Sequence, residues 1–227
     1  MSSKFKKKNC IYCDKPATTK DHVPQECFFP KPAPKNLITV PSCFDCNNSF
    51  ADDENYVRTV LASARLNDIP NSPVEKIWNQ KVQRSLQKNP KVLKEVFKSF
   101  LPIDVYHGSI YFGKRPGFRC DRERVDRIMG KIVKGLFYFE NKKPLPNDFI
   151  VKVFLSPNED DKIPNEIKES ICTSIIKCVS KDVFKYRTIH LPEDPNYSVW
   201  VLNFYDSYLN FICLTWKELK SNNIDKI

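Results

Sequence analysis

Two CxxC pairs near the N-terminus constrain this chain more than any other feature. Cys10 and Cys13 form the first pair, and Cys43 and Cys46 form the second, after a long proline-rich segment. Four thiolates at this spacing are typical of a tetrahedral zinc site in which every position is filled by protein, so the metal is structural. Because a module this small buries little apolar surface, we expect zinc to hold it folded.

The composition favours a cytoplasmic protein with a polyanionic partner and no membrane span. Mean hydropathy is −0.47, and the N-terminus lacks the apolar stretch of a secretory signal. In a reducing cytoplasm, the nine cysteines are expected to be metal ligands and buried thiols rather than disulfides. The formal net charge of +10 favours nucleic acid. Five cysteines lie outside the pairs and are expected to be buried: Cys27, Cys120, Cys172, Cys178 and Cys213.

The hydrophobic pattern predicts an α+β fold in three parts. We expect a zinc-held module with a basic N-terminal arm over residues 1–70 and a helical segment over residues 71–100. An α+β region with mostly antiparallel strands is expected over residues 101–227. Within the first part, Leu37–Val40 is a short β-branched run typical of a strand, and Asp52–Glu54 marks the start of a helix.

Further elements follow from apolar periodicity and start signals. Helices are predicted from Ser72 to Leu86, where serine, proline and glutamate form a capping box, and from Asn89 to Phe100. Two more helices are predicted over residues 121–139 and 164–179. Strands are predicted over residues 105–112, 149–155, 183–191, 198–204 and 209–215.

An acidic residue followed by a histidine, Asp21-His22, lies between the two cysteine pairs. Hydrolysis of a phosphodiester needs an activated water and a cation to neutralise the developing charge. The neutral imidazole of His22 can take a proton from water near neutral pH, and the carboxylate of Asp21 is a ligand that Mg²⁺ prefers. Neighbouring side chains of an extended segment point to opposite faces, so the two must converge through a bend, which Pro24 helps to shape.

Two asparagines complete the candidate site. Asn36 precedes the predicted strand, and Asn47 follows Cys46 directly, so zinc is expected to fix the backbone of Asn47. Amide groups can orient an imidazole and can bind a hard metal ion. His22 is the only histidine before His107, which makes it the candidate base in this module.

The stretch Cys10–Arg58 resembles the HNH endonucleases, which have a treble-clef-like ββα-metal module. More narrowly, it looks like a group of bacterial stand-alone HNH proteins, a class found in mobile elements and in defence against phages. The motifs that carry the resemblance are Cys10-x-x-Cys13, Asp21-His22-Val23-Pro24, Asn36-Leu37-Ile38 and Cys43-x-x-Cys46-Asn47.

The resemblance implies a role for each matching residue. His22 corresponds to the general base, Asp21 and Asn47 to the ligands of a catalytic Mg²⁺ or Mn²⁺, and Asn36 to the brace of the hairpin and the base. The segment after Asn36 is longer than in compact members, and the adjacent Asn48 leaves the ligand assignment open by one position. The implied activity is metal-dependent cleavage of DNA, with RNA as the other substrate.

Two other classes of protein share these features. A non-catalytic, zinc-dependent nucleic-acid-binding module has the same cysteines and charge but gives His22 no role. A RING-like protein-interaction module needs about eight ligands for two zinc ions, and no cysteine follows Cys46 before Cys120. A basic stretch over residues 114–127 either follows a phosphate backbone or is a solvated surface. Residues 101–227 are expected to serve recognition, dimerisation or partner binding.

Overall fold

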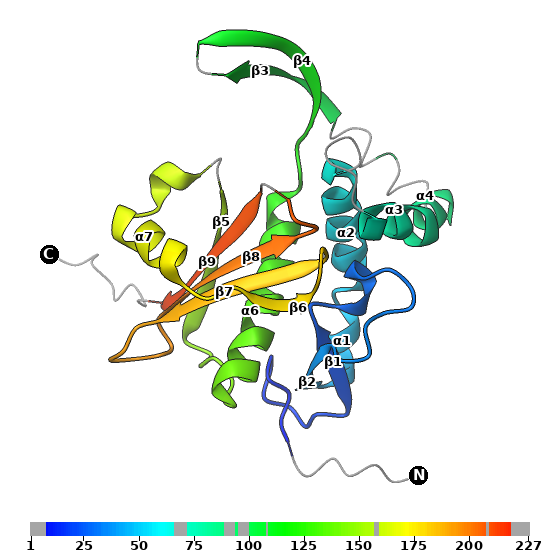
Figure 1. The fold of residues 1–227 in the computed structure, drawn as a ribbon. Helices are drawn as coiled ribbons and strands as arrows, with labels where there is room; N and C mark the ends of the chain where they lie inside the picture. The colour runs from blue at the N-terminus through cyan, green and yellow to red at the C-terminus, as the bar shows by residue number, and fades with distance from the viewer. Residues whose placement is uncertain are drawn as a thin grey trace, which may run out of the picture.

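The chain combines helices with antiparallel strands, as the α+β prediction expects. In the described residues the strands form three sheets: β1–β2, β3–β4, and a five-stranded sheet in the order β5-β9-β8-β7-β6. No described helix is both long and apolar enough to cross a membrane. The computed structural model (Figure 1) describes residues 8–65, 72–88, 94, 100–107, 109–156, 159–207 and 209–218.

The N-terminal part is a β-hairpin followed by two helices. β1 and β2 pair antiparallel, and a proline-rich connection with one 3-10 turn joins them. The strand predicted at Leu37–Val40 is confirmed as β2, and the helix predicted from Asp52–Glu54 is confirmed as α2. The elements are β1 (Thr19–Val23), η1 (Glu26–Phe28), β2 (Ile38–Ser42), α1 (Phe44–Asn48) and α2 (Ala51–Arg65).

The next helical run matches one prediction and leaves a second largely outside the described residues. α3 (Ser72–Ile77), η2 (Trp78–Val82) and α4 (Gln83–Lys88) follow one another without a break, and η2 is a π-helical turn. The helix predicted from Ser72 is therefore present. Most of the helix predicted from Asn89 lies outside the described residues, and its expected last residue, Phe100, is the first residue of a strand.

A second β-hairpin extends from the body of the molecule (Figure 1). β3 (Phe100–His107) pairs antiparallel with β4 (Ile110–Phe118). The single strand predicted over residues 105–112 is wrong, because the chain reverses between His107 and Ile110. The Gly-Ser pair in the sequence between them is typical of a turn.

The long predicted helix is confirmed as α6 (Arg122–Asn141). Asp121 begins it by accepting a hydrogen bond from the Arg124 backbone N–H. The helix lies between the β1–β2 hairpin with α2 on one side and the five-stranded sheet on the other (Figure 1). Most of its apolar residues are buried, and Ile128 and Leu136 are fully so, whereas Phe139 near its C-terminal end is exposed. α6 is therefore the centre of the core.

The five-stranded sheet confirms the four strands predicted over residues 149–155, 183–191, 198–204 and 209–215. The helix predicted over 164–179 ends earlier than expected, because a run rich in Thr, Ser and Ile follows Cys172 and favours extended backbone. The elements are β5 (Phe149–Ser156), η3 (Asp160–Lys162), α7 (Asn165–Thr173), β6 (Lys177–Ser180), β7 (Phe184–His190), β8 (Ser198–Phe204) and β9 (Asn210–Lys217).

One apolar cluster draws on all three predicted parts of the chain. It includes Phe28 from the β1–β2 connection, Ile77 from α3, and Ile132 and Trp200 from α6 and β8. The buried Tyr205 hydroxyl also donates to the Phe28 carbonyl at 3.0 Å. The division of the chain at residues 70 and 100 stays a prediction.

The cysteines outside the two pairs do not all lie in the core. Cys213 is buried and Cys27 and Cys120 are partly buried, but Cys172 and Cys178 are exposed. The prediction of buried thiols is therefore wrong for the last two. Their position explains this, since Cys172 lies near the end of α7 and Cys178 on the edge strand β6.

Candidate metal centre and the Asp21-His22 strand

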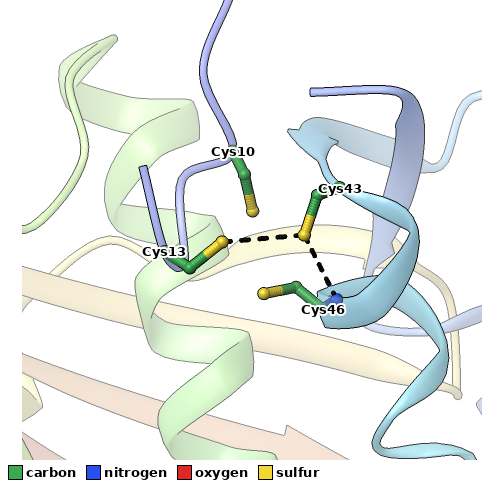
Figure 2. A group of neighbouring side chains, drawn as sticks. All are labelled: Cys10, Cys13, Cys43 and Cys46. Carbon is green, nitrogen blue, oxygen red and sulfur yellow. Dashed lines mark hydrogen bonds between the residues drawn. The ribbon is translucent and has the colours of Figure 1, made fainter. Parts of the chain in front are cut away.

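The four predicted zinc ligands meet at one point. The sulfur atoms of Cys10, Cys13, Cys43 and Cys46 all lie within 4.8 Å of one another (Figure 2), and all four thiols are free. The sulfurs of Cys13 and Cys43 are 3.6 Å apart, which is too far for a disulfide. A tetrahedron with zinc–sulfur bonds of about 2.3 Å has sulfur atoms about 3.8 Å apart. The cluster therefore fits a zinc ion.

Backbone groups favour a thiolate at Cys10, whereas burial and the neighbouring thiols raise the pKa of Cys46. Cys43 caps the N-terminus of α1, and its sulfur accepts a hydrogen bond from the Cys46 N–H at 3.4 Å. Burial opposes ionisation of Cys10, but hydrogen bonds with the backbone of Cys43, Tyr12 and Cys13 lower the pKa of its thiol to about 7. Such hydrogen bonds fix ligand orientation and stabilise negative charge on sulfur.

Asn47, next to the last cysteine of the cluster, braces β1. Its Nδ2 donates to Thr19 Oγ1 at 3.2 Å and to the Lys20 carbonyl at 3.3 Å. Asn48 instead donates to the Phe44 carbonyl within its own helix. Of the two adjacent asparagines, Asn47 is thus the one whose side chain reaches the strand that carries Asp21.

Asp21 points into the protein interior and is paired with a lysine. Its side chain is 4% exposed, and its Oδ2 lies 3.0 Å from the Nζ of Lys131 on α6. The same Nζ donates to Glu54 Oε1 on α2 at 2.9 Å. Burial raises the pKa of Asp21 and of Glu54, and the Lys131 ammonium opposes that rise. One buried ammonium therefore joins two carboxylates from different elements; we call this set the Lys131 triad.

His22 leaves β1 on the opposite face from Asp21. Successive side chains of a strand alternate, and accordingly Asp21 and Val23 are buried while His22 is partly exposed. The Cα partner of His22 on β2 is the exposed Thr39. Pro24 follows the end of β1, so any bend there comes after both residues rather than between them. The structure thus brings Asp21 together with Lys131 and Glu54, and not with His22.

Asn36 lies at the far end of the hairpin from the zinc cluster. It is exposed in the turn before β2, just beyond the pairing of Val23 with Ile38. Among the described residues, its side chain forms no hydrogen bond with that of His22. Its role as a brace for the base stays a prediction.

A divalent ion at Asp21 does not fit the observed contacts. The carboxylate is enclosed, and the Lys131 ammonium already lies against it and against Glu54. Asn47 directs the amide nitrogen of its side chain to β1, which leaves its Oδ1 as the atom that a hard cation would take. For Asp21 to hold Mg²⁺, the lysine would have to move away.

Lys131 and Glu54 were not identified as partners of Asp21 from the sequence. One signal was available for the lysine, because it stands between apolar residues of the α6 pattern, next to Ile132. A charged residue in an apolar stripe is rarely buried without a partner. Glu54 offered no such signal, since a carboxylate in the first turn of a helix has an ordinary explanation in the helix dipole.

The arginines in the helical half of the basic stretch form ion pairs with carboxylates of neighbouring elements. Arg124 and Arg127 both bind Asp53, at 2.7 and 2.8 Å, and Arg122 binds Glu159 at 2.6 Å. These arginines hold α6 to α2 and to the residues after β5. Because these arginines already have carboxylate partners, a phosphate would bind more readily to the basic residues before α6, in the strand and the loop.

Compared with protein-family models, with curated proteins and with solved structures, the chain has no match. Its function must therefore be inferred from the zinc cluster and from the two faces of β1.

Proposed function

We propose that the chain is an HNH-type endonuclease that acts on DNA and uses His22 as its general base. The observation that supports this is the position of His22 on the partly exposed face of β1. The opposite face of the strand is anchored by Asp21 on Lys131, and its start is held by Asn47 beside the zinc cluster. A side chain on a strand fixed in this way is preorganised for a ligand that approaches from solvent.

In the proposed reaction His22 acts as a neutral imidazole. It takes a proton from a water molecule, whose oxygen then attacks phosphorus in line with the leaving 3′ oxygen. The new P–O bond forms as the P–O3′ bond breaks, and the leaving oxygen takes a proton from solvent. Zinc held by four thiolates has no open position, so it maintains the geometry without taking part.

The resemblance also implies Mg²⁺ or Mn²⁺ on Asp21 and Asn47, which would neutralise charge at the phosphate. Because the observed contacts of Asp21 do not fit a divalent ion, we assign no step to one. Mn²⁺ binding to the zinc-loaded protein, followed by electron paramagnetic resonance, tests the assignment directly. Equal binding by the wild type and by Asp21→Asn would remove Asp21 from the site.

A plasmid-nicking assay in Mg²⁺ and Mn²⁺ tests the proposed base. His22→Ala is expected to lower the nicking rate by about 100-fold or more. Thr39→Ala, the matched change at the paired position of the same hairpin, is expected to leave it within about threefold. Zinc content and melting temperature are measured for each variant, and equal nicking by His22→Ala and wild type would contradict the proposal. A labelled RNA in the same assay separates the two substrates.

The Lys131 triad favours a second candidate, a non-catalytic, zinc-dependent nucleic-acid-binding module. In such a protein Asp21 is a structural residue with no metal to hold, as its contacts with Lys131 suggest. It would bind DNA but would not nick it in the presence of either Mg²⁺ or Mn²⁺. A RING-like interaction module has less support, since the described residues contain one candidate metal cluster, with four ligands.

A further inference from the structure

The β3–β4 hairpin projects from the molecule, and no other described element lies over it (Figure 1). It forms a two-stranded sheet of its own, and no buried core residue among those described comes from it. It carries exposed apolar side chains, with Leu101 at 42%, Ile110 at 64% and Tyr111 at 50% exposure. A lone two-stranded hairpin is marginally stable in water. A partner that covers these side chains would therefore stabilise it.

The hairpin is curved along its length (Figure 1). Its register shifts between Asp104 and Tyr106, and Gly113 on the opposite strand has a φ of 94°. A bulge of this kind bends a strand and increases its twist, and the positive φ suits glycine. The major groove of DNA admits a two-stranded β-ribbon, and a curved, twisted ribbon can follow the path of a duplex.

The charge of the hairpin favours a polyanion. Lys114 and Arg119 are exposed and form no ion pair within the described residues, in contrast to the arginines of α6. The sequence adds Arg115, and Asp104 is the only acidic residue between Phe100 and Cys120. The Asp104 carboxylate accepts a hydrogen bond from the Tyr111 hydroxyl at 3.0 Å. A second copy of the same hairpin would bring like charges together, which opposes self-association.

We propose that the β3–β4 hairpin is a binding arm for duplex DNA. Lys114 and Arg119 contact phosphates, and Ile110 and Tyr111 at the tip enter a groove against the base edges. The inference deepens the proposed function, because it rests on DNA being the substrate and assigns substrate binding to a segment outside the zinc module.

Fluorescence anisotropy with a labelled duplex tests the arm without cleavage. The protein carries His22→Ala, and no divalent ion is added, so the duplex is not cleaved. No chelator is used, so the zinc stays bound. Lys114→Gln with Arg119→Gln is expected to weaken binding about tenfold and to reduce the slope of log K against log salt by about 1.8, which corresponds to two lost phosphate contacts. The control is Lys143→Gln, an exposed lysine beyond the far end of α6, roughly 30 Å along that helix.

The tip has a different expected signature. Ile110→Ser removes an apolar contact and no charge, so it is expected to weaken binding severalfold with an unchanged salt slope. Circular dichroism and melting temperature are recorded for each variant, and a native spectrum with selective loss of binding supports the arm.

Three results would overturn the arm. In the first, the Lys114/Arg119 variant has the same affinity and salt slope as Lys143→Gln. In the second, the parent protein does not bind duplex DNA. The third is a dimer by sedimentation velocity that Ile110→Ser converts to a monomer without loss of DNA affinity, which would make a second copy the occupant. If neither the wild type nor any variant nicks DNA but the hairpin variants lose DNA binding, the nuclease proposal fails and the proposal of a DNA-binding arm is supported.

Discussion

The two separate hairpins of this molecule have the same topology but different surroundings. β1–β2 has strands of five residues, with the zinc cluster at one end and α6 against its inner face, where Val23 and Val40 are buried. β3–β4 has longer strands, yet among the described residues it has neither a candidate metal cluster nor a packing layer. Strand length therefore does not decide which hairpin is held against the rest of the molecule. The contacts beyond the ladder do.

The largest expected effect comes from breaking the zinc end of β1–β2. Cys43→Ser is expected to abolish stoichiometric zinc and to lower the melting temperature by on the order of 10 °C, because zinc binding supplies folding free energy to the module. Elemental analysis and calorimetry measure the two quantities. Cys172→Ser, at an exposed cysteine, is the control and should change neither. Retention of zinc and stability by Cys43→Ser would show that the hairpin does not depend on the metal.

The next effect comes from the inner face of the same hairpin. Lys131→Met leaves Asp21 and Glu54 buried without their shared cation, and loss of one partner from a buried ion pair costs about 3–5 kcal/mol. Urea unfolding measures the change. Lys134→Met on the same helix, where the side chain is partly exposed, is the control and is expected to stay within about 1 kcal/mol of wild type.

The destabilisation by Lys131→Met should also depend on pH in one direction. Burial raises the pKa of Asp21 and of Glu54, and the Lys131 ammonium opposes that rise. Removal of the ammonium therefore raises both pKa values further. A group with a raised native pKa stabilises the fold below its unfolded pKa, and that contribution is lost as pH rises through the native value. The difference between variant and wild type should therefore be smallest near pH 3 and grow above about pH 4. Growth toward acid pH would contradict the triad.

A smaller effect tests the contact between β1 and α6. A Cβ at Gly135 would lie 2.5 Å from Val23 Cγ2, whereas one at Gly130 would meet Val151 Cβ at 3.8 Å. Gly135→Ala is therefore expected to lower the free energy of unfolding by about 1–3 kcal/mol. Gly130→Ala, the matched change in the same helix, is expected to raise it by up to about 1 kcal/mol. Equal effects of the two would mean that β1 does not pack closely on α6.

The smallest effect is expected from β3–β4. Replacement of residues 104–115 by a short glycine-containing turn removes no described core residue, so the melting temperature should stay within about 2 °C of wild type. Thermal unfolding followed by circular dichroism measures it. A loss comparable to that of Gly135→Ala would show that the hairpin packs against the body after all.

Sequence patterns over a few turns or a few residues predicted the features that depend on neighbouring residues. The apolar period predicted α6 closely, and spacing alone predicted the meeting of the four cysteines. The pairing of Asp21 with Lys131 joins segments far apart in the chain, so no local pattern could reveal it. The opposite faces of Asp21 and His22, however, follow from strand alternation. An extended segment with no turn between them already opposes a shared site.

The hydrogen bond from Tyr205 to Phe28 has a consequence for the order of synthesis. The two residues are 177 positions apart, so at 5–20 residues per second the carbonyl waits roughly 10–35 s for its partner on the ribosome. Early in that interval, before residues 122–141 of α6 and the strands of the large sheet are made, Phe28 and Phe29, later fully buried, lack the elements that cover them. A zinc ion on the four cysteines would stabilise the nascent module before those elements are made. Cells starved of zinc are therefore expected to accumulate this protein as aggregates rather than in the folded form.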